Sequence, residues 1–199
     1  MKKEKRLTDK DRLHGEYGDQ YVFVAMDADT KLVPTFTVGK RNSHTTLIFI
    51  QALYDKLQNN GRIQLTSDGF TAFPPAIEQT FGDDINYAQI IKTFSYTTGG
   101  YSPPEMVEAI FHIVNGIPDR DKASTSFIER QNLTLRMQMR RFTRLTNAFS
   151  KKLENLKAAI SLHFAHYNFM RIHKTLRVTP AMEAKITDHV WGWKELIFT

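Results

Sequence analysis

Cysteine is absent from the 199 residues, which excludes disulfide bonds and thiolate metal sites. The chain also lacks any run of about 18 apolar residues, which is the length that a membrane-spanning helix needs. Its polar start, "MKKEKRLTDKDRLHGEYGDQ", contains no apolar stretch of the kind that forms the centre of a secretion signal. From these three absences we expect a cytoplasmic protein that does not associate with membranes.

Acidic residues are scarce in one long segment, and this scarcity carries more information than the net charge of +6. Residues 129–177 hold 11 Lys and Arg but only 2 Asp and Glu, whereas the rest of the chain holds 16 and 19. Segregated positive charge favours a polyanionic partner, most simply nucleic acid. The alternative is a solvated helix face that binds nothing.

The hydrophobic content of 41% suffices for one globular domain with a core, or for a domain with a short helical tail. Short β-rich apolar runs predict strands, and longer periodic runs predict helices. The expected strands are 21–27, 31–39, 62–69 and 85–94, and the expected helices are 45–57, a short one ending at Gly82, 126–143 and 150–169. We expect Ser43 to cap the first helix, residues 95–124 to be irregular because they are rich in Gly and Pro, and a short last helix after a turn at Pro180.

This order of elements predicts a mixed α/β fold, in which a central mixed β-sheet is flanked by helices. The first two strands are expected to pair antiparallel, and the later strands alternate with helices. We place a polar extension at residues 1–18, the main domain at 19–170, and a helical C-terminal tail, packed on the core or extending it, at 171–199.

Three acidic residues lie where expected elements end or begin. Asp27 ends the first strand, Asp68 ends the third, and Glu129 lies near the start of the basic helix. If those two strands are neighbours in the sheet, their carboxylates emerge side by side, and a helix packed at that edge can bring the third carboxylate to them. Oxygen donors of this kind suit Mg²⁺, and a pair of such ions clamps both oxygens of a reacting phosphodiester. The simpler interpretation treats each residue as a turn or first-turn acid, as we expect for Asp29.

The basic helix has two faces on a helical wheel. One stripe holds the apolar side chains Ile128, Leu135, Met139 and Phe142. Glu129, Arg136 and Arg140 fall on a line beside this stripe, and Asn132 lies one turn from the acid on the same side. A carboxylate on the flank of a packed helix can reach a sheet edge, while the arginines above it can hold a DNA backbone.

Five stretches carry a family resemblance: "VFVAMDADTKLV", "IQLTSDGFTAF", "YAQIIKTF", "TSFIERQNLTLRMQMRRFTRLTNAFSKK" and "YNFMRIHKTLRVTPAM". Together they resemble the DDE transposases of bacterial insertion sequences, closest to the type carried by insertion sequence 1. The resemblance implies a ribonuclease H-like core similar to that of retroviral integrases. In such a core Asp27, Asp68 and Glu129 are catalytic and bind two Mg²⁺ ions, for which Mn²⁺ can substitute. Asn132 matches the asparagine of the family's "ERxN", and Arg136 matches the basic residue that follows the acid by seven positions.

The resemblance implies the catalytic domain of a DNA transposase, which cleaves a strand and transfers the freed 3′-hydroxyl to target DNA. The alternatives are a non-catalytic DNA-binding remnant or inhibitor of a full-length transposase, and a nuclease on the same fold. The expected DNA contacts are Asn132, Arg136, Arg140, Arg144, Lys151, Lys152, Arg171 and Lys174. The expected partners are transposon ends, target DNA, further copies of the chain in a homo-oligomer on DNA, and a DNA-binding protein or domain encoded upstream.

Histidines near the end of the chain offer another candidate site. His163 and His166 have the i, i+3 spacing that zinc ligands can have, and His173 follows. No further ligand has a suitable spacing and aromatic residues surround these histidines, so we expect them to pack. For Arg171 and Lys174, phosphate contact and simple solvation are equally good interpretations.

Overall fold

The computed structural model describes residues 7–13, 17–57, 61–95, 105–143, 150 and 152–198. Its internal contacts divide the chain into two compact units. The first unit comprises residues 1–41 and 127–199, and the second comprises residues 42–126. The boundaries expected from the sequence, 1–18, 19–170 and 171–199, stay a prediction.

The first unit is built mainly from helices around one β-hairpin. Its strands are β1 (Tyr21–Val24) and β2 (Phe36–Gly39), which pair antiparallel. Its helices are α1 (Asp9–Leu13), α4 (Ser126–Gln138), the 3-10 turn η2 (Arg140–Phe142), α5 (Leu153–Ala165), the π-helical turn η3 (His166–Met170), α6 (Pro180–Glu183) and α7 (Trp193–Phe198). The antiparallel pairing of the first two strands is thereby confirmed.

The core of the first unit lies between this hairpin and α5. Leu156, Ile160 and Phe164 recur at every fourth position of α5, so they share one helix face. They form a cluster with Val33 and Val38 of the hairpin segment. The ring of Phe164 lies 4.9 Å from that of Phe36, measured between centroids. Burial of this apolar face, more than intrinsic helix propensity, stabilises a helix of this length.

A buried amide joins η3 to the hairpin at one residue. Asn168, which is 8% exposed, accepts a hydrogen bond at Oδ1 from the Val33 N–H (3.1 Å). Its Nδ2 donates to the Val33 carbonyl (2.9 Å). The side chain thus satisfies both backbone groups of a buried residue, as a neighbouring strand would do.

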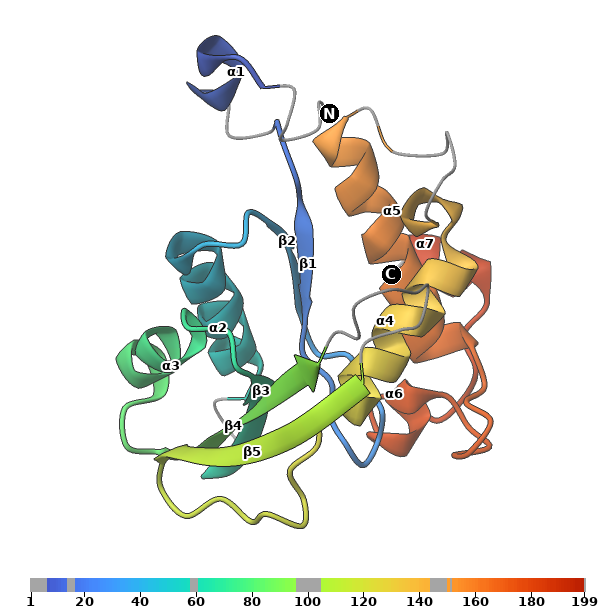
Figure 1. The fold of residues 1–199 in the computed structure, drawn as a ribbon. Coiled ribbons are helices and arrows are strands. Elements are labelled where there is room, and N and C mark those ends of the chain that lie inside the picture. Colours follow the sequence, from blue (N-terminus) through green and yellow to red (C-terminus); the bar gives the residue numbers. More distant parts are fainter. Residues whose placement is uncertain are drawn as a thin grey trace. The chain divides into compact units, whose positions relative to one another are not determined.

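In the second unit, helices and strands alternate along the chain, except that the last two elements are both strands. Its elements are α2 (Ser43–Leu57), β3 (Ile63–Asp68), α3 (Phe73–Phe81), β4 (Ile85–Ser95) and β5 (Glu105–Asn115). The strands form one mixed sheet in the order β3-β4-β5, where β3 and β4 are parallel and β5 is antiparallel to β4 (Figure 1). The parallel pair is connected through α3, as a parallel connection requires. This sheet with its helices confirms the mixed α/β class.

Two expectations about the sheets need correction. The described strands form two sheets, β1-β2 and β3-β4-β5, where the element order predicted a single central sheet. That the first strand neighbours the 62–69 strand stays a prediction. The region 95–124, expected to be irregular, contains the 11-residue strand β5. Its sequence, "EMVEAIFHIVN", is rich in β-branched and aromatic residues, and the glycines and prolines before it concealed this signal.

The basic helix is shorter than the predicted range 126–143. It ends at Gln138, and Met139 is extended, with φ −108° and ψ 103°. Arg140 therefore begins η2 and leaves the helical line that Glu129 and Arg136 define. Met139 and Phe142 still pack against the first unit's core, but they reach it from the 3-10 turn.

The cap of the first long helix also differs from the prediction. The Thr45 N–H donates to Oδ1 of Asn42 (2.9 Å), so Asn42 caps α2 in place of Ser43. The expected end of α3 at Gly82 is confirmed, since Gly82 has φ 54° and follows the last helical residue. The expected short helix after Pro180 is confirmed too, because α6 begins there with Thr179 as its cap. None of the helices in the described ranges is long and apolar enough to cross a lipid bilayer.

Candidate functional site

Asp27 lies three residues after β1, in the turn that leads towards β2. Its N–H donates to the Leu32 carbonyl (2.8 Å), and its own carbonyl accepts from the Lys31 N–H (3.0 Å). Its carboxylate accepts from the N–H of Asp29 (3.1 Å) and from the N–H (3.4 Å) and hydroxyl (2.5 Å) of Thr30. The side chain is exposed and holds a tight turn, the local pattern that an Asp favours.

Lys31 connects this turn to the start of α4. Its Nζ lies 3.5 Å from the centroid of the Phe127 ring, a cation–π geometry, and it also donates to the Ala28 carbonyl. The Lys31 carbonyl accepts from the Tyr167 hydroxyl (3.2 Å). Lys31 has a positive φ of 60°, which is unusual for a residue with a Cβ. The turn that carries Asp27 is therefore fixed against two helices of the first unit.

Glu129 lies in the first turn of α4, two residues after Phe127. Its side chain is exposed, and a carboxylate at this position is favoured by the helix dipole. The cation–π contact thus brings the Asp27 turn against the same helical turn that carries Glu129. Gln131 of the same helix was not predicted to be buried. It is 3% exposed, and its Nε2 has no hydrogen-bond partner among the described atoms.

Asp68 is the last residue of β3, in the second unit, and its side chain is exposed. Its Oδ1 accepts from the Phe70 N–H (3.1 Å). The buried amide of Gln89 in β4 donates from Nε2 to the carbonyls of Asp68 (2.9 Å) and Phe70 (3.3 Å). One side chain of the neighbouring strand therefore ties down both ends of the turn that presents the carboxylate.

A second contact from β4 supports the same turn. The hydroxyl of Tyr87 lies 2.8 Å from Oγ of Ser67, and that Oγ donates to the Asp68 carbonyl (2.8 Å). Tyr87 is fully buried, and burial raises the pKa of its hydroxyl to about 12. The hydroxyl accordingly stays protonated over the physiological range and serves as a neutral hydrogen-bonding group.

The three carboxylates fit a hard divalent cation by donor type. An ionised carboxylate offers about four acceptor positions, so the hydrogen bonds of these turns do not exhaust Asp27 or Asp68. Asp27 and Glu129 belong to the first unit and Asp68 belongs to the second. Within the ranges that the structure describes, no three Asp, Glu or His side chains are grouped as a metal site. A shared Mg²⁺ site therefore stays a prediction.

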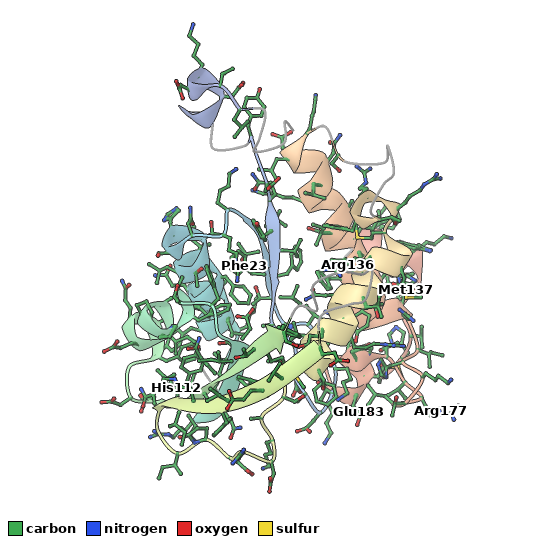
Figure 2. The ribbon with its side chains drawn as sticks, viewed as in Figure 1. Phe23, His112, Arg136, Met137, Arg177 and Glu183 are labelled. Carbon is green, nitrogen blue, oxygen red and sulfur yellow. The ribbon has the colours of Figure 1, made fainter. Side chains whose placement is uncertain are left out.

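The predicted DNA-contacting residues belong to the first unit. Four of them are exposed in the structure: Arg136, Arg140, Lys152 and Lys174. Asn132 and Arg171 are partly buried, whereas Arg144 and Lys151 lie outside the described residues. Figure 2 labels Arg136 on α4, and also Arg177, a further exposed cation of this unit. The structure therefore places several solvent-facing cations on the unit that carries Asp27 and Glu129.

The histidines pack, as the sequence indicated. The His163 ring lies edge-on to Phe164 at 5.2 Å between centroids, and the His166 ring stacks on Trp193 at 5.8 Å. Burial lowers the pKa of His163 to about 4, helped by the positive charge of Arg171 and by His166. The His163 ring is therefore neutral at physiological pH.

Three supporting residues escaped sequence reasoning: Lys31, Gln89 and Asn168. Two of them left a usable signal, because Gln89 interrupts the apolar run "YAQII" and Asn168 interrupts the aromatic run "HYNFM". A lone polar residue in a buried segment must find a hydrogen-bond partner. Lys31 gave no sequence signal, because a positive φ is usually predicted from a Gly or Asn at that position.

No protein-family model, no curated protein and no solved structure matches this chain. Its class is therefore defined by what the structure contains, which is a mixed α/β protein with exposed carboxylates at strand ends and exposed cations on one unit.

Proposed function

We propose that the chain is the catalytic domain of a DNA transposase with a ribonuclease H-like core, acting on DNA in the cytoplasm. It would cleave a DNA strand at the end of a mobile element and transfer the freed 3′-hydroxyl to target DNA. The observation that carries the proposal is the contact of Lys31 with Phe127, which brings the Asp27 turn against the first turn of α4, where Glu129 lies. The motif resemblance adds Asp68, which ends β3 and is also exposed.

The three carboxylates have one proposed role, which is to hold Mg²⁺. When bound, the ions would lower the pKa of the attacking hydroxyl or water and stabilise the charge that develops on the phosphate. The protein's share is to fix the geometry: the turns at Asp27 and Asp68 leave each carboxylate at the surface while tying down its backbone. A carboxylate held in this way loses little conformational entropy when it binds a ligand.

The exposed cations have a second role, which is to hold the DNA backbone. Arg136, Arg140 and Lys152 are exposed on the unit that carries Asp27 and Glu129. An arginine can bind a phosphate through two parallel hydrogen bonds, and such contacts position DNA without reading its sequence. Sequence-specific recognition of element ends is assigned to a DNA-binding protein or domain encoded upstream, with copies of the chain assembling on the DNA.

The test is a strand-joining assay with Mn²⁺ and DNA from the ends of the element that encodes the chain, pre-nicked to expose the 3′-hydroxyl. The wild type should join this end to target DNA, and Asp27→Asn, Asp68→Asn and Glu129→Gln should each reduce joining to background. Asp29→Asn is the matched control, because it removes the same charge two residues away. It should retain most of the activity.

Other outcomes would replace the proposal. DNA binding without joining or nicking would favour a non-catalytic remnant or inhibitor. Cleavage of unrelated DNA without joining would favour a nuclease. An essential Asp29 with a dispensable Asp27 would move the first ligand by two residues.

A further inference from the structure

Strand β5 forms one edge of the second unit's sheet. It is hydrogen-bonded to β4 on one side, and no other described strand pairs with it. An edge strand presents a row of backbone N–H and C=O groups that can pair with another chain. Natural edges are commonly protected by lysine or proline, and "EMVEAIFHIVN" contains neither.

The side chains of β5 are unusually apolar for an exposed strand. Met106, Val107, Ile110 and Ile113 have between 45% and 65% of their surface exposed. Ile91 and Phe94, on the paired strand β4, are exposed as well. Single apolar residues on a surface are ordinary, but a continuous exposed apolar strand marks an interaction site.

Two bulges define which part of this edge is regular. In the pairing with β4, Thr93 faces Glu108 and Phe94 faces Met106, so Val107 is an extra residue. In the same way, Tyr87 faces Asn115 and Ala88 faces Ile113, which leaves Val114 unpaired. Between the bulges, residues 108–113 form an uninterrupted ladder. Since bulges bend a strand and disturb its edge, pairing with another chain is confined to this stretch.

Residues 108–113 are complementary in charge to the same residues of a second copy that runs antiparallel to them. In an antiparallel pair of identical strands centred on Ile110, Glu108 lies directly opposite His112 of a second copy, and symmetry repeats this pair. A register centred on Glu108 or on His112 would instead place identical polar groups opposite each other, which is unfavourable. Figure 2 labels His112 on the strand.

We propose that β5 is a dimerisation edge, at which two copies of this chain pair antiparallel around Ile110. The two sheets then form one continuous sheet of six strands, in the order β3-β4-β5-β5-β4-β3. The contact is isologous, so it closes with two copies and does not propagate into a fibre. The proposal involves no residue of the candidate catalytic site, and it stands or falls independently of the proposed function.

The absence of cysteine makes the register directly measurable. In Ile110→Cys the two introduced thiols face each other across the symmetry axis, at the roughly 4.5–5.5 Å between Cα atoms that opposed residues have. This separation lies within the range that a disulfide spans. Mild oxidation should therefore give a covalent dimer that dithiothreitol reverses.

Neighbouring positions provide the matched controls. Ala109→Cys and Phe111→Cys place the two thiols on a diagonal of about 7–8 Å, too far for an unstrained disulfide. Each should cross-link about tenfold more slowly than Ile110→Cys. A maximum at 109 or 111 would overturn the proposed register, and equal slow reaction at all three positions would overturn the interface.

A second measurement does not depend on oxidation. Sedimentation at micromolar concentrations should show a dimer for the wild type and a monomer for Ile110→Lys, which places two like charges at the axis. Ile110 is 45% exposed, so the substitution should leave the fold intact, and circular dichroism checks this. Glu108→Lys should also weaken the dimer, and Glu108→Lys with His112→Glu should restore it. A monomeric wild type, or a dimer that survives Ile110→Lys, would overturn the proposal.

Discussion

The turns at Asp27 and Asp68 present similar exposed carboxylates but are supported in different ways. The Asp27 turn is held mostly by its own residues, through bonds from Asp29, Thr30 and Lys31. The Asp68 turn makes two such local bonds, from the Phe70 N–H and the Ser67 hydroxyl, and is otherwise held by the buried β4 side chains of Gln89 and Tyr87. Local turn chemistry supports the first carboxylate, whereas tertiary structure supports the second.

This difference matters because the two kinds of support fail differently. Bonds among exposed residues of a turn compete with water, so each contributes little to folding. A buried donor that serves two carbonyls has no water to replace it, so its loss costs much more. We therefore expect the Asp68 turn to depend mainly on Gln89, which makes the direct bonds from β4, and the Asp27 turn to tolerate the loss of any single bond.

The largest expected effect is that of Gln89→Leu. This substitution keeps the approximate size of a side chain that is 6% exposed, but it removes the donor to the carbonyls of Asp68 and Phe70. We expect a loss of about 2 kcal/mol in the free energy of unfolding, measured by urea denaturation.

The matched variant in the other turn is Thr30→Val, which removes the hydroxyl donor to Asp27 and preserves the side-chain shape. It should cost about 0.5–1 kcal/mol, because the backbone bonds remain and the site is exposed. Equal losses for the two variants would contradict the contrast between buried and local support.

A smaller effect should appear on acidification, and it should originate in the first unit. Burial lowers the pKa of His163 from its ordinary 6.5 to about 4. The unfolded chain therefore binds this proton at a higher pH than the folded chain does. The stabilisation of the fold by the neutral, buried His163 ring is therefore complete above pH 6.5 and is lost as the pH falls from there through about 4. The melting temperature should fall over this interval, and His163→Leu should flatten the fall.

The stability of the second unit should depend on pH at the alkaline end of the pH range. Burial raises the pKa of Tyr87 from 10.0 to about 12, so its contribution is complete below pH 10 and is lost as the pH rises through about 12. His163→Leu should leave that alkaline loss unchanged. If His163→Leu changed the acid loss and the alkaline loss of stability equally, His163 would act on the whole fold and not on the first unit alone.

The contrast between the turns also explains how much the sequence could predict. Short-range signals placed β3, β4, the end of α3 at Gly82 and the start of α6 at Pro180 close to their observed positions. They also placed the start of β1 and the end of β2, but β1 ends at Val24 and β2 begins at Phe36, so both strands are shorter than the expected 21–27 and 31–39. These features depend on local period and turn chemistry. The exposed turn positions of Asp27 and Asp68 followed from the same signals.

Features that depend on distant contacts were missed. After the basic helix ends at Gln138, Met139 and Phe142 pack against the first unit's core. The hydrogen bond from Gln89 to the Asp68 carbonyl spans 21 residues of sequence. Strand β5 was missed for another reason, because the glycines and prolines before it outweighed its β-branched content. Periodicity identifies faces and ends of elements, but it does not identify which buried polar group meets which turn.

The smallest expected effect concerns Lys31, the residue that joins the Asp27 turn to α4. A left-handed conformation costs a residue with a Cβ about 1 kcal/mol relative to glycine, and an exposed cation–π contact returns about 0.5–1 kcal/mol. Lys31→Gly removes both contributions, so its free energy of unfolding should stay close to that of the wild type. Lys31→Ala removes the side-chain contacts but keeps the Cβ, so it should be less stable than Lys31→Gly by about 1 kcal/mol.

Lys185 is the matched control, because it has nearly the same φ of 58° and belongs to the same unit. Unlike Lys31, it has no ring contact recorded in the described residues, so Lys185→Gly should relieve the backbone strain with little loss. It should stabilise the protein by about 1 kcal/mol in the same urea titration. The measured difference between the two glycine variants is then the joint contribution of the Lys31 side-chain contacts with the Phe127 ring and the Ala28 carbonyl. If both variants stabilised the protein equally, the side-chain contacts of Lys31 would contribute nothing, and the hydrogen bond from the Tyr167 hydroxyl to the Lys31 carbonyl would remain to hold the Asp27 turn to a helix.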